Sequence, residues 1–180
     1  WEAIHAVSRV GEPQSLSGSN IIEFTHDPQD SATFYVGTER NGIFFTYNGG
    51  QSWTQAPRNL KSGLIRSLAV DPDNSCIIYA AQAGQVHKSD DCARSFTATY
   101  FADKPETFIS ELAVDSFNSN IVYMGTSAGD VLKSFDGGKN WRALRHFKGA
   151  IRQILVNPKD TRIVYVGTLS QGLYRTENGG

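Results

Sequence analysis

The sequence has little of what marks a membrane-spanning, nucleic-acid-binding or helical protein. No apolar run approaches the roughly 20 residues that a membrane helix needs, so no transmembrane segment is expected in this chain. The formal net charge is −1, from 17 Lys and Arg against 18 Asp and Glu, which gives no electrostatic reason to expect nucleic acid as a partner. Amphipathic stretches of helix length are few. What is present, 17 Gly and 11% aromatic residues, favours short strands and tight turns.

The chain contains four copies of a unit of about 44 residues. The units begin their apolar patterns at Ile21, Ile65, Ile109 and Ile151. Their aligned tyrosines are Tyr35, Tyr79, Tyr123 and Tyr165, which gives spacings of 44, 44 and 42 residues. Internal repetition at this period is typical of propeller blades and other repeat architectures.

Each unit has the pattern of four short antiparallel strands. An apolar run ends at an Asp or Asn turn signal, a β-branched and aromatic run follows, and a Gly-containing tip leads into the third strand. One such sheet cannot bury both faces alone, so neighbouring units must stack. The prediction is an all-β fold, a β-propeller of four-stranded antiparallel blades. We expect repeats at about 20–63, 64–108, 109–150 and 151–180, with 1–19 completing the last, in one domain that is either complete or part of a larger propeller.

A polar stretch precedes the fourth strand of each unit, and this stretch resembles the Asp-box, or BNR repeat, with the pattern S/T-x-D-x-G-x-T/S-W. The best match is Ser134-Phe135-Asp136-Gly137-Gly138-Lys139-Asn140-Trp141. The first unit has Asn48 for the Asp, the second has Ala93 for the Gly and Phe96 for the Trp, and the fourth ends at Gly180. The box positions expected to be structural are Asn48, Gly50, Trp53, Asp91, Phe96, Asp136, Gly138, Trp141, Asn178 and Gly180.

The physical role expected of the box is to build a turn. A short carboxylate or amide accepts backbone N–H bonds, Gly supplies positive φ, and the aromatic ring anchors the turn between sheets. In propellers that the chain resembles, ligands bind at the opposite face, where the other loops emerge. Asp136 and its equivalents are therefore predicted to form turns and not to act as catalysts.

The two cysteines, Cys76 and Cys92, both belong to the second unit. A hairpin that turns near Ala83-Gly84 places them within one residue of direct opposition. We expect a disulfide and with it an exported protein, periplasmic, lumenal or extracellular. The alternative is two free thiols in a cytosolic protein. No metal site is expected, because no CxxC or HxxxH spacing occurs.

Candidate binding residues lie on the predicted first strands and on one tip. One aligned column contains Glu23, Ser67, Glu111 and Gln153, and the next contains Ile22, Arg66, Ser110 and Arg152. Glu39 and Arg40 form the most charged tip. The predicted binding face is Glu23, Glu39, Arg40, Arg66, Glu111 and Arg152. Two facing carboxylates suit acid and base roles in glycoside hydrolysis, whereas the alternative is a set of solvated residues lining a water-filled channel.

Families with Asp boxes include sialidases, xyloglucanases, sortilin-like receptors and photosystem II assembly factors. The resemblance implies an Arg-Ile-Pro motif in a sialidase, which is missing here, and a Thr-Asp-x-Gly-Gly stretch in a xyloglucanase. The corresponding stretch here, Thr38-Glu39-Arg40-Asn41-Gly42, has no aspartate. We therefore predict no catalytic residue and no cofactor, and a module that binds a protein complex or a cell-surface or extracellular glycan, with further blades or a second copy as additional partners. The alternative is an exported xyloglucanase- or sialidase-like hydrolase, or a fragment of one.

Overall fold

The computed structural model describes residues 4, 16–56, 60 and 62–180, and its regular elements are β-strands. They form four antiparallel sheets in which consecutive strands are hydrogen-bonded neighbours. We call these sheets blades 1 to 4. Blade 1 contains β1 (Ile21–His26), β2 (Phe34–Thr38), β3 (Ile43–Thr46) and β4 (Thr54–Gln55). Blade 2 contains β5 (Ile65–Val70), β6 (Ile78–Gln82), β7 (Gln85–Ser89) and β8 (Thr97–Phe101). Blade 3 contains β9 (Ile109–Val114), β10 (Val122–Thr126), β11 (Asp130–Ser134) and β12 (Arg142–His146). Blade 4, with three strands in the described residues, contains β13 (Ile151–Val156), β14 (Val164–Thr168) and β15 (Gly172–Thr176).

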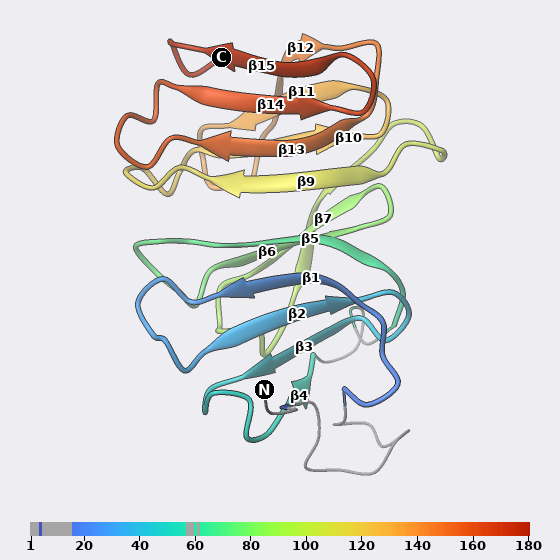
Figure 1. Ribbon diagram of the computed structural model, residues 1–180, viewed down its shortest axis with the longest axis vertical. Coiled ribbons are helices and arrows are strands. Elements are labelled where there is room, and N and C mark those ends of the chain that lie inside the picture. The colour runs from blue at the N-terminus through green and yellow to red at the C-terminus, as the bar shows by residue number, and fades with distance from the viewer. Residues whose placement is uncertain (1–3, 5–15, 57–59, 61) are drawn as a thin grey trace.

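The first strands of the blades, β1, β5, β9 and β13, follow one another in space and make contact from each blade to the next (Figure 1). The remaining strands of each blade extend outward from this inner row in sequence order. The fold is therefore a β-propeller with four blades in this chain. The all-β class and the blade architecture that the repeat predicts are confirmed.

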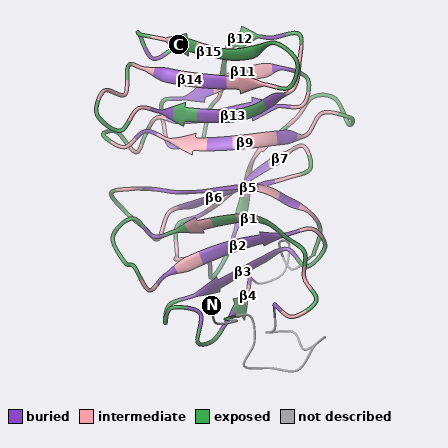
Figure 2. Ribbon diagram, in the orientation of Figure 1, coloured by how far each residue is buried: buried purple, intermediate pink, exposed green. Residues whose placement is uncertain are grey.

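The hydrophobic core consists of layers between blades. The first layer joins Tyr35 and Phe45 of blade 1 to Ile65, Leu68 and Ile78 of blade 2. Equivalent layers lie between blades 2 and 3 and between blades 3 and 4. Burial is greatest in β2, β3, β6 and β10, whereas β1, β12 and β15 are largely exposed or half-buried (Figure 2). Stability thus comes from contacts between nearest neighbours, as in other repeat proteins.

A close approach recurs where blades meet. A Cβ added to Gly37 on β2 would lie 2.8 Å from Cγ2 of Ile65 in blade 2, and one added to Gly125 on β10 would lie 2.4 Å from Cγ2 of Ile151 in blade 4. Both isoleucines are fully buried. The absence of a side chain at these two positions lets the next blade pack directly on the second strand. We call the isoleucine the plug and the glycine position the socket of each joint.

The polar turns before the fourth strands are held by their own side chains. Asp136 Oδ1 accepts from the Ser134 hydroxyl and from the Asn140 backbone N–H, both at 2.8 Å, and the Gly138 N–H donates to Ser134 Oγ at 2.8 Å. Asp91 accepts in the same way from Ser89 and Ser95. Asn48 and Asn178 also accept from the hydroxyl two residues before them. Each turn is thus a small closed network of hydrogen bonds that follows the third strand of its blade.

The predicted disulfide between Cys76 and Cys92 is present. The register of the hairpin pairs Ile78 with Ser89, and the Cys92 N–H donates to the Cys76 carbonyl at 3.0 Å. The disulfide therefore extends the β6–β7 pairing beyond the last paired residues. The turn that follows has no glycine, and Cys92 and Ala93 adopt φ values of 59° and 64°.

The predicted completion of the last blade by 1–19 falls mostly on 1–3 and 5–15, which lie outside the described residues. Ile4, which is described, lies beside blade 1, where its carbonyl oxygen accepts from Trp53 Nε1 at 2.7 Å. Among the described residues no helix is long and apolar enough to cross a membrane.

Candidate functional site

Each inner strand carries an irregularity at its second residue. The pairing of β1 with β2 shifts between Ile21 and Glu23, and that of β5 with β6 shifts between Ile65 and Ser67. The same shift occurs in blades 3 and 4. The inserted residues of the four strands are Ile22, Arg66, Ser110 and Arg152. A β-bulge leaves its extra residue out of the regular ladder and re-aims its side chain, and bulges are frequent beside binding sites. The bulges therefore define one end of the inner row, which we call the mouth.

Glu111, just after the bulge of blade 3, is held from both neighbouring blades. The Ser67 hydroxyl of blade 2 and the Ile154 backbone N–H of blade 4 both donate to its carboxylate. Ser67 is itself buried and accepts from the Leu112 N–H at 3.0 Å. Burial, followed by the charge of Glu23, raises the pKa of Glu111 to about 7, against the lowering effect of those two donors. Near neutral pH the Glu111 carboxyl is thus available in both protonated and ionised forms.

Glu23 of blade 1 is the second carboxylate of the mouth. Burial raises its pKa, and its charge is felt by Glu111 two blades away. The structure therefore brings these two predicted residues into one electrostatic environment. Their different surroundings give them different affinities for a proton, which is the requirement for separate acid and base roles.

Two arginines occupy bulge positions of the mouth, Arg66 on blade 2 and Arg152 on blade 4. The Arg66 guanidinium stacks over the Phe108 ring, 3.8 Å from its centroid. Burial, followed by the charge of Arg152, lowers the pKa of Arg66. Between them, in blade 3, the Ser110 hydroxyl is buried and has no hydrogen-bond partner within the part of the chain that the structure describes. The mouth thus carries guanidinium donors and carboxylate acceptors that suit a polar ligand.

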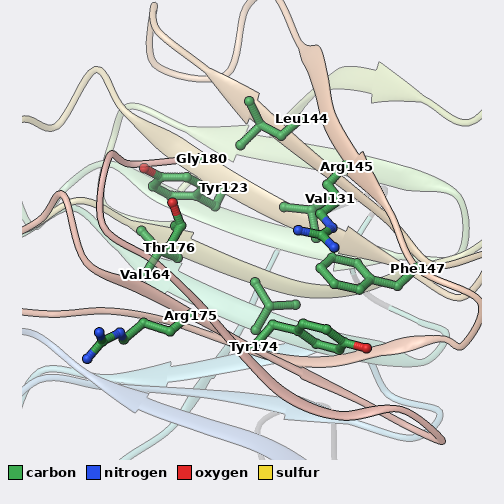
Figure 3. Close-up of a pocket in the computed structure, with 11 residues that line it drawn as sticks. Tyr123, Val131, Leu144, Arg145, Phe147, Val164, Tyr174, Arg175, Thr176 and Gly180 are labelled. Carbon is green, nitrogen blue, oxygen red and sulfur yellow. The ribbon is translucent and has the colours of Figure 1, made fainter.

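A hollow of about 390 Å³ lies beside Arg66. It is lined by 62–64, Arg66, Gln82 and Ala83, and Gln82 Nε2 donates to the Ser62 carbonyl at 2.6 Å. Its volume is within the range of roughly 300–1,000 Å³ that small-molecule sites occupy. By contrast, the cavity between blades 3 and 4 in Figure 3 measures about 70 Å³ and is lined largely by apolar side chains such as Val131, Val164 and Phe147. Of these two, the hollow beside Arg66 is therefore the better candidate for a ligand site.

The charged tip of blade 1 lies next to the loop that lines this hollow. The Gly63 N–H donates to the Arg40 carbonyl at 2.7 Å, and Glu39 accepts from Asn20 Nδ2 at 2.7 Å. Among the described residues, the Glu39 and Arg40 side chains make no hydrogen bond or ion pair with Glu23 or Glu111. This tip forms a rim of the candidate site and is separate from its carboxylate pair.

No family model matches this chain. Two curated proteins are similar in sequence. A probable oligoxyloglucan-reducing end-specific xyloglucanase from Neosartorya fischeri is 30% identical over 135 residues, which cover 63% of this chain and 16% of that protein. A xyloglucanase from Hypocrea jecorina is 25% identical over 167 residues, which cover 89% of this chain and 20% of that protein. The chain thus spans about a fifth or less of the length of the curated relatives it matches.

Solved structures share the fold. An ancestral GH74 enzyme superposes with a TM-score of 0.79 at 22% identity, over 94% of this chain and 24% of that one. YCF48 bound to D1 peptide superposes with a TM-score of 0.65 at 14% identity, over 93% of this chain and 60% of that one. At these identities the likeness establishes the propeller fold, which hosts unrelated functions.

Sequence reasoning did not detect the bulges, although the sequence contains a signal for them. In blade 2, Ile65 and Leu68 are both buried although they are three residues apart. Ile109 and Leu112 repeat this spacing in blade 3. Regular strands place residues of even spacing on one face, so an apolar pair three apart requires an inserted residue.

No three or more His, Cys, Asp or Glu side chains within the described ranges are grouped to hold a metal ion.

Proposed function

We propose that this chain is part of an exported Asp-box propeller whose mouth binds a neutral plant-type glucan, such as a xyloglucan oligosaccharide. The observation that carries the proposal is the set of bulges at one end of the inner row, three of which have the polar residues Arg66, Ser110 and Arg152 at the inserted position, with Glu111 directly after Ser110. Sugar hydroxyls both donate and accept, so they suit a site with guanidinium donors and carboxylate acceptors. The curated relatives, named as xyloglucanases, support this ligand class.

Two further parts of the proposal rest on separate observations. The hydroxyl–carboxylate networks of the polar turns, seen at Ser134 with Asp136 and at Ser89 with Asp91, support the Asp-box assignment. The disulfide between Cys76 and Cys92 supports export, because disulfides persist in oxidising compartments.

Calorimetric titration with a xyloglucan oligosaccharide tests the binding. Arg152→Ala should weaken binding by about tenfold to a hundredfold, since a lost charge-assisted hydrogen bond is worth about 1.5–3 kcal/mol. Arg142→Ala is the matched control, because Arg142 is an exposed arginine on the outer strand β12. Absence of heat with any glucan, or an equal loss in both variants, would contradict the proposal and leave protein docking at the mouth as the alternative.

A second candidate function is hydrolysis of such a glucan, and the raised pKa of Glu111 is the observation that favours it. In this role Glu111 would protonate the leaving oxygen and Glu23 would act as the partner carboxylate. The test is release of reducing ends from xyloglucan near neutral pH. Activity that is lost in both Glu111→Gln and Glu23→Gln, while glucan binding persists, would establish it, and no release by the unaltered chain would exclude it.

A further inference from the structure

Polar side chains link each of the inner strands β5, β9 and β13 to the next, which lies beside it (Figure 1). An inner strand is the end strand of its sheet, so one edge of its backbone has no strand partner in that sheet. The Leu112 N–H of blade 3 donates to Ser67 Oγ of blade 2 at 3.0 Å. The Ile154 N–H of blade 4 donates to the Glu111 carboxylate of blade 3 in the equivalent place. The aligned polar residue of one blade thus caps a backbone donor of the next.

Ser67 has a second bond, and it ends at Glu111. Ser67 is 2% exposed, and a serine hydroxyl has one proton to donate. Its oxygen accepts from Leu112, and its proton is donated to the Glu111 carboxylate. The direction of this O–H bond is therefore set by the backbone of the same strand that carries Glu111.

The Glu111 carboxyl is consequently held by donors from the blades on either side. Neither donor can take a proton from it, because the Ile154 N–H has no acceptor capacity and the Ser67 hydroxyl is already donating to it. A proton bound to Glu111 is thus left for whatever occupies the mouth. Both donors favour the ionised form, whereas burial and the charge of Glu23 oppose it.

Few other ionisable groups lie on the strands packed against β9. These strands are β5, β6, β10 and β13, and their ionisable side chains are those of Arg66, Tyr79, Tyr123 and Arg152. The two tyrosine hydroxyls are bonded to the polar turns of blades 3 and 4. The charge that raises the pKa of Glu111 is that of Glu23.

We propose that Ser67 is a positioning residue of the mouth, which fixes the Glu111 carboxyl and keeps part of it ionised near neutral pH. A ligand then meets an acceptor as well as an acid at the same place. The role toward a ligand rests on the proposed function, whereas the effect of Ser67 on Glu111 does not.

Titration of the Glu111 carboxyl carbon by NMR tests the effect directly, with Glu111→Gln identifying the signal. The pKa should be about 7 in the unaltered chain. Ser67→Ala should raise it by roughly one unit, a tenfold change in proton affinity, because a donor to the ionised form is lost. Ser67→Thr keeps the hydroxyl and should leave the pKa near its original value. An unchanged pKa in Ser67→Ala would overturn the proposal.

Ser119→Ala is the matched control, because it removes another serine–carboxylate bond between the same two blades. Ser119 Oγ donates to Asp71 at 2.6 Å and to Asp73 at 3.0 Å. This variant should leave the titration of Glu111 unchanged. Equal shifts in Ser67→Ala and Ser119→Ala would mean that loosening of the contact between the blades, and not the lost donor, changes the proton affinity.

Calorimetric titration with a xyloglucan oligosaccharide at a series of pH values tests the role toward a ligand. In Ser67→Ala the midpoint of the pH dependence of binding should move upward by the same roughly one unit as the pKa of Glu111. A midpoint that stays in place while the pKa moves would overturn Ser67 as a positioning residue for the ligand. If the unaltered chain binds no glucan, the proposed function fails, and a shifted Glu111 titration in Ser67→Ala would still support the pairing of Ser67 with Glu111.

Discussion

The hydroxyl of Tyr79 donates a hydrogen bond to the carbonyl oxygen of Gly137 at 3.0 Å, which joins the second strand of blade 2 to the polar turn of blade 3. Tyr123 makes the same bond to Gly179 at 2.9 Å. Both tyrosines are 1% exposed, and burial is the main reason that the pKa of each is raised, for Tyr123 to about 12. The polar turns of blades 3 and 4 are thus tied to the preceding blade as well as to their own.

Replacing Tyr79 by Phe should destabilise the fold by about 1–3 kcal/mol, because the buried Gly137 carbonyl loses its donor while the ring packing is kept. Urea unfolding followed by circular dichroism measures the change. Tyr165→Phe is the matched control, since within the described residues its hydroxyl makes no such bond. Equal effects of the two substitutions would show that the bond between blades contributes nothing.

Removing the disulfide should lower stability by about 3 kcal/mol, because it closes a loop with a sequence separation of 16 residues. Cys76→Ala with Cys92→Ala is the variant to measure by thermal unfolding. Cys76→Ala with Cys92→Gly should recover part of the loss, about 1 kcal/mol, because Cys92 has a φ of 59° that glycine adopts without strain. If both variants unfold at the temperature of the unaltered chain, the disulfide is not a stabilising element.

Asp136→Ala should lower the melting temperature and leave glucan binding unchanged, because its carboxylate serves the turn and lies outside the mouth. Asp136→Asn should be milder, since Asn48 occupies the same place in blade 1. The pKa of Asp136 is lowered to about 2, first by the Asn140 side chain. Its stabilising effect is thus present above its unfolded pKa of about 3.8 and is lost as the pH falls through about 2. Loss of binding with unchanged stability in Asp136→Ala would reverse this assignment.

Glu111 should make the fold less stable as the pH rises from about 4.5 to about 7. Its folded pKa of about 7 exceeds the unfolded value of 4.5, so over this range the unfolded chain releases the proton and the folded chain keeps it. Chemical unfolding at a series of pH values should show this decline in the unaltered chain and a flatter profile in Glu111→Gln. An identical profile in both would show that Glu111 titrates normally.

The blades could be predicted from sequence because each carries the same local signals. Strand patterns, turn residues and the placement of Cys76 opposite Cys92 all depend on neighbours along the chain or on one hairpin. The environment of Glu111 depends instead on Ser67 and Ile154, which come from two other blades. The aligned repeats place Glu23 and Glu111 in one column. How far the pKa of Glu111 is raised by burial and by the charge of Glu23 depends instead on how the strands and their bulges pack. Those are products of packing between blades, which a repeat pattern does not specify.

Within the described blades, the polar turn of blade 2 differs from the others in holding left-handed backbone without glycine, at Cys92 and Ala93. Left-handed conformations are unfavourable for such residues by roughly 1–2 kcal/mol each, and here a covalent bond holds the strained segment in place. Once the bond is reduced, a turn inside the array, and not one at its end, would lose its covalent restraint. Because blades communicate only through their neighbours, melting of blade 2 would uncouple blade 1 from blades 3 and 4. We therefore expect the redox state of this cysteine pair to influence whether blade 1 unfolds together with blades 3 and 4.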